Sequence, residues 1–141
     1  MNMNIKLRNT LAEITGASVA MIWMWYNLTE ASKMTIESIS KVLAQGIGIS
    51  IIAIIALTIV INIFSSVITG SYEKNIDDER DGLYELYALR LSSAIFGISI
   101  VTILVLLGWF NLTINIGLIA ITLSGFIASI ASLLLKIYLY N

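Results

Sequence analysis

The residues best suited to chemistry lie in one short acidic segment between two long apolar stretches. Five carboxylates fall between Asp77 and Glu85, and one arginine lies among them. Carboxylates at this spacing can bind a cation, dock a basic surface or cap a helix. The segment is therefore the first candidate site, and its members are Asp77, Asp78, Glu79, Arg80, Asp81 and Glu85.

One interpretation of this segment needs no partner, and a second is a calcium site. Asp78 and Asp81 have the spacing of an N-cap pair, and acids in a first turn offset the helix dipole. Asp77, Glu79 and Asp81 also match the opening of an EF-hand loop, but position 12, where a bidentate Glu belongs, is Ala88. We therefore predict no metal site and no cofactor.

The composition removes most catalytic chemistry. The chain has no Cys, His or Pro, so thiol and imidazole nucleophiles and the usual zinc ligands are missing. An intramembrane enzyme built on paired carboxylates would lack a nucleophile and a metal set. The net charge of −1 disfavours nucleic acid as a partner. We predict that the protein is not an enzyme.

The elements around the acidic segment indicate a membrane protein. Of the 141 residues, 58% are hydrophobic and 12% are charged, and the mean hydropathy is +0.92. A spanning helix needs about 20 apolar residues. Residues 42–72, 91–110 and 112–135 carry no charge, whereas the first uncharged run covers only residues 14–29. A cleaved signal peptide is the alternative for this first run, but Thr29-Glu30-Ala31 is a poor cleavage site.

We predict an all-α membrane protein, a four-transmembrane-helix bundle made of two helical hairpins in one domain, residues 1–141. The expected helices cover about 10–29, 42–72, 83–110 and 113–138. Lys and Arg concentrate at one side of such a bundle, which places both termini in the cytoplasm of a multi-pass cell-membrane protein. That side holds Lys6, Arg8, Lys74, Arg80, Arg90 and Lys136, and the other holds Lys33 and Lys41.

The two hairpins share a short sequence pattern. Trp-Tyr-Asn-Leu-Thr at 25–29 is repeated as Trp-Phe-Asn-Leu-Thr at 109–113. The pattern indicates either an internal duplication or aromatic residues placed independently at the outer membrane interface.

Asp78-Glu79-Arg80-Asp81, between the second and third expected spans, resembles the D-E-R-[DE] signature of a loose group of small, largely uncharacterised prokaryotic four-span membrane proteins. The resemblance covers about a dozen residues and the hairpin layout. It implies the same architecture and brings no activity with it.

Small residues predict where helices pack closely. The fourth expected helix carries an i, i+4 stripe, and the second carries Ala44, Gly48 and Ala56. We expect the fourth helix to be the central packing helix or an oligomer face. Its stripe consists of Ala120, Ser124, Ala128 and Ser132.

Three polar residues are expected within the membrane: Glu13, Asn62 and Arg90. A charge near hydrocarbon is costly unless it is paired or hydrated. Glu13 and Arg90 could therefore meet, or each could extend separately to the cytoplasmic surface. Asn62 could bond to a neighbouring helix or line a pore.

These observations leave two functions open. The first is a non-enzymatic subunit in the lipid bilayer, homo-oligomeric, whose acidic loop docks a cytoplasmic or membrane protein partner or a neighbouring subunit. The second is a small ion channel or transporter with the acidic loop at its cytoplasmic mouth. A channel needs a continuous polar stripe. A docking subunit is instead expected to bond its buried polar groups to one another and to leave no polar path.

Overall fold

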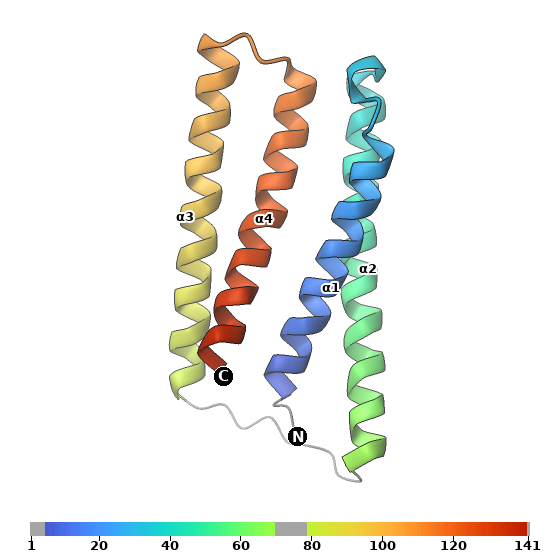
Figure 1. Ribbon diagram of the computed structural model, residues 1–141, viewed down its shortest axis with the longest axis vertical. Coiled ribbons are helices and arrows are strands. Elements are labelled where there is room, and N and C mark those ends of the chain that lie inside the picture. Colours follow the sequence, from blue (N-terminus) through green and yellow to red (C-terminus); the bar gives the residue numbers. More distant parts are fainter. Residues whose placement is uncertain (1–4, 70–78, 141) are drawn as a thin grey trace.

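The computed structural model describes residues 5–69 and 79–140, and in this part of the chain every long element is an α-helix (Figure 1). The helices are α1 (Ile5–Asn27), α2 (Ile36–Thr69), α3 (Glu79–Trp109) and α4 (Ile114–Tyr140), and a 3-10 turn, η1 (Ala31–Lys33), precedes α2. Because the chain contains no proline, nothing interrupts the hydrogen-bond ladders of these long helices. The expected all-α class is confirmed.

The helix boundaries differ from the expected ones mainly at N-terminal ends. α1 begins at Ile5 and α2 at Ile36, where the apolar pattern predicted starts near 10 and 42. In both helices the extra residues include charged ones that precede the uncharged run. Helical hydrogen bonding continues through them because it does not stop at the edge of the hydrocarbon layer. Asp78, the expected N-cap of α3, lies outside the described residues, and Glu79 is the first residue of α3.

Three helices are long and apolar enough to cross a membrane: α2, α3 and α4. Only 6% of the most apolar window of α2 is buried inside the structure, and many large aliphatic side chains on it are exposed. A water-soluble protein would not expose so much apolar surface. This surface marks the chain as a membrane protein. α1 is less apolar and is not among the three.

The helices form two antiparallel hairpins with roughly parallel axes (Figure 1). The starts of α1 and α3 and the ends of α2 and α4 lie at one end, which we call the polar end. The turns at 28–35 and 110–113 lie at the opposite end. Within the second turn Asn111 has a φ of 51°, a left-handed conformation that asparagine tolerates.

α4 holds the two hairpins together. It packs against α3, and also against α1, α2 and η1. Ser124 and Ala128 of the small-residue stripe are buried, whereas Ala120 and Ser132 are half-buried. At the turn end, α1 and α2 enclose a core of Met24, Ile39 and Leu43, against which Leu118 of α4 packs.

Candidate functional site

Charged and amide side chains from all four helices gather at the polar end. Lys6 of α1 donates to the Asp81 carboxylate of α3 at 2.5 Å, and both side chains are about 85% buried. Asn62 of α2 donates to Asn9 of α1 at 3.2 Å. Arg8 bonds to Ser65 of α2. These contacts connect the start of α1 to both α2 and α3.

A polar cavity of about 190 Å³ lies within this gathering. One face of α1 supplies four lining residues at i, i+3, i+4 and i+7 spacing, which places them side by side on a helix. α3 contributes one residue and α4 contributes two, a turn apart. The lining is almost entirely polar and consists of Lys6, Asn9, Thr10, Glu13, Glu85, Lys136 and Tyr140.

Two contacts fix the walls of the cavity. The Lys6 to Asp81 ion pair joins α1 to α3. The rings of Tyr84 on α3 and Tyr140 on α4 meet edge to face, with centroids 5.5 Å apart, a favourable aromatic geometry. The cavity is therefore held on three sides by helices that are themselves joined.

The acidic segment does not act as one cluster in the described part of the chain. Asp81 is bound to Lys6, Arg80 is exposed, and Glu85 faces the cavity. Asp77 and Asp78 lie outside the described residues, and the side chain of Glu79 is not described. The sequence pattern predicted one acidic site, whereas in the structure Asp81 is paired with Lys6.

Glu13 and Arg90 do not meet. Glu13 is half-buried in the cavity lining, and Arg90 is exposed on α3. Within residues 5–69 and 79–140, no ion pair joins their side chains. The contact between α1 and α3 is made instead by Lys6 and Asp81, nearer the helix ends.

Sequence reasoning missed several lining residues: Lys6, Asn9, Thr10, Lys136 and Tyr140. The signal was present in α1, because its polar residues recur on one helical face. Among the described residues, no group of three or more His, Cys, Asp or Glu side chains could hold a metal ion. Charge pairing and hydrogen bonding are the chemistry that this arrangement offers.

Comparison with protein families, curated proteins and solved structures gives no match for this chain.

Proposed function

We propose that the chain crosses the membrane four times, with the polar end in the cytoplasm. The support for α1 as a span is its register against α2. Asn9 meets Asn62, Gly16 meets Ile54, and Met24 meets Gly46, so α1 runs antiparallel along the apolar part of α2. Its 23 residues reach about 34 Å, enough for a hydrocarbon core of about 30 Å.

In this membrane we propose a non-enzymatic, oligomeric subunit whose acidic segment docks a partner or a neighbouring copy at the cytoplasmic end. The observation that carries the proposal is that polar side chains at this end join α1 to its neighbours, through Lys6 to Asp81, Arg8 to Ser65 and Asn62 to Asn9. The side-chain amide of Asn62 donates to Asn9, while the Asn62 side-chain oxygen is buried without a partner among the described residues. Arg80 and Glu85 remain exposed on α3, where a partner can reach them.

The middle of the molecule supports a docking subunit over a channel. A cavity of about 360 Å³ between the hairpins is lined chiefly by apolar side chains, including Ile47, Ile54 and Phe96. Ser50 and Thr122, which also line it, donate to carbonyls of their own helices. An ion on this path would meet few groups able to replace its hydration shell.

Ion flux into liposomes tests the choice between these two functions. We expect purified wild-type protein and Asn62→Leu to give the same flux as empty vesicles, because Asn62 serves only to bond α1. Flux through the wild type that Asn62→Leu abolishes would establish the channel and remove the proposal.

The mass of the purified assembly tests the docking role. The chain alone is 15.5 kDa, and we expect a larger assembly in mild detergent. Neutralising Asp77, Asp78 and Glu85 together as amides should reduce it, because Coulombic attraction to the neighbour is lost. Asp81 stays unchanged because it bonds to Lys6. Glu30→Gln with Glu37→Gln at the turn end is the matched control. An unchanged assembly in the neutralised variant contradicts docking through these acids.

A further inference from the structure

The lining of the polar cavity includes three charged side chains that have no partner among the described residues. Lys6 is bound to Asp81. In the part of the chain that the structure describes, no ion pair or hydrogen bond engages the side chains of Glu13, Glu85 or Lys136. The cavity thus brings together one unpaired ammonium and two unpaired carboxylates. Glu13 and Lys136 are half-buried and Glu85 is exposed, so a charged guest at the membrane surface can reach all three.

The position of the cavity limits the guest. It lies between α1, α3 and α4 at the polar end, where the apolar stretches of α3 and α4 stop and where lipid headgroups lie in a membrane. Two further cavities are lined mainly by apolar side chains, among them Trp25 and Leu123 in one and Phe96 and Phe126 in the other. A guest at this level needs polar groups of both signs.

We propose that the cavity binds a phosphoethanolamine group, with its ammonium at Glu13 and Glu85 and its phosphate at Lys136. A primary ammonium has three N–H donors and can bond to both carboxylates. A lysine ammonium is a common phosphate partner. An anionic headgroup without an amine would leave both carboxylates uncompensated, and a quaternary amine has no N–H to donate.

The cavity shares Glu85 with the proposed docking segment, whereas Glu13 and Lys136 line the cavity and are not docking acids, so substituting them tests this site alone. Either proposal can fail while the other holds. The same group can come from phosphatidylethanolamine in the bilayer or from free O-phosphoethanolamine in solution, and the experiment separates these two sources.

Native mass spectrometry of the full chain, released from nanodiscs of equal parts phosphatidylethanolamine and phosphatidylcholine, tests the proposal. We expect about tenfold enrichment of the ethanolamine lipid on the wild type, as one charge-assisted hydrogen bond provides. Glu13→Gln and Glu85→Gln should each lower this enrichment, because only the ammonium contacts distinguish the two lipids. Lys136→Met should weaken the binding of both lipids, since both carry the phosphate. Lys136→Arg, which keeps the charge, and Arg90→Gln, which lies outside the lining, should keep the enrichment.

Added O-phosphoethanolamine decides the source. Displacement of the bound lipid by the soluble compound supports a free ligand of the same chemistry, and persistence of the lipid adduct supports a headgroup site. Equal binding of the two lipids by the wild type overturns the proposal, and so does an equal loss of enrichment in Arg90→Gln and Glu13→Gln. Circular dichroism of each variant shows whether it is folded, and Glu85→Gln provides a test if Glu13→Gln is not.

Discussion

At the scale of single residues, the polar end is organised by specific pairs rather than by total charge. Lys6 and Asp81 are 75 positions apart in sequence, yet they form the ion pair that joins the two hairpins. The sequence could identify both as charged and near the same membrane face, because the distribution of Lys and Arg is a local pattern. It could not pair them, since pairing depends on the rotation of α1 relative to α3.

We expect Lys6 and Asp81 to be energetically coupled. A double-mutant cycle of Lys6→Met, Asp81→Leu and the double variant should give a coupling free energy of about 1–3 kcal/mol, since each single change leaves a largely buried charge without this partner. Unfolding in SDS, followed by circular dichroism, measures it. Additive effects of the two changes would show that the pair contributes nothing specific.

At the scale of helices, close approach depends on glycines whose partners the sequence does not reveal. A Cβ on Gly16 would lie 2.6 Å from Ile54 Cγ1 and 3.0 Å from the Ile54 backbone nitrogen, so this is where α1 and α2 nearly touch. Gly48, part of the predicted α2 stripe, would meet nothing within 4 Å. Ala44 and Ala56 of that stripe are exposed. The α2 stripe therefore faces away from the other helices.

Gly16→Ala should destabilise the α1–α2 hairpin by about 1–3 kcal/mol, because the Ile54 backbone cannot move aside without separating the helices. The free energy of unfolding in SDS is the measurement. Gly97→Ala is the matched control, since its new Cβ would meet nothing within 4 Å and should leave stability unchanged. Equal effects of the two substitutions would contradict the close approach.

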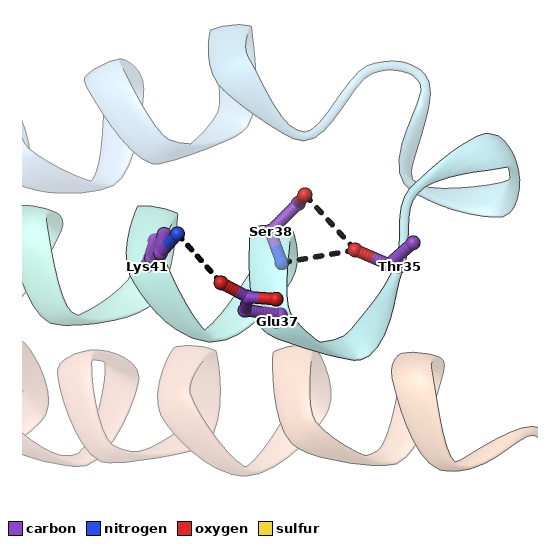
Figure 2. Close-up of polar contacts among 4 residues, drawn as sticks. All are labelled: Thr35, Glu37, Ser38 and Lys41. Atoms are coloured by element: carbon purple, nitrogen blue, oxygen red, sulfur yellow. Dashed lines mark hydrogen bonds and ion pairs between the residues drawn. The ribbon is translucent and has the colours of Figure 1, made fainter.

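The start of α2 shows why helix boundaries were harder to predict than helix number. Figure 2 shows that Thr35 Oγ1 accepts a hydrogen bond from the Ser38 backbone N–H at 3.3 Å, and that Lys41 pairs with Glu37 at 2.7 Å. These polar contacts begin the helix at Ile36. Hydropathy alone places the start of the helix at the beginning of the uncharged run, residue 42, several positions later.

Thr35→Ala should cost about 1 kcal/mol of unfolding free energy, because it removes the side-chain acceptor at the helix start. Hydrogen exchange at the Ser38 amide should quicken in this variant. Thr35→Ser keeps the hydroxyl and should retain wild-type exchange. Unchanged exchange in Thr35→Ala would mean that the cap does not fix the start of α2.

At the scale of the whole molecule, α4 joins the two hairpins, and many large apolar side chains of the hairpins remain exposed on the outer surface. The small residues of α4 and the apolar runs allowed this arrangement to be expected from sequence. The cavity at the polar end was not predicted, because it depends on side chains from three helices meeting at one depth. The uncharged run of α1 is too short to establish a span by itself. Its register against α2 provides the further argument.

The central claim is that α1 crosses the membrane beside α2. The chain has no native cysteine, so single cysteines can be labelled without background. In intact cells, an impermeant maleimide should label Lys33→Cys and Phe110→Cys at the turn end, and should label Asn2→Cys and Arg80→Cys only after permeabilisation. Labelling of Asn2→Cys together with Lys33→Cys in intact cells would place both ends of α1 outside and contradict the account.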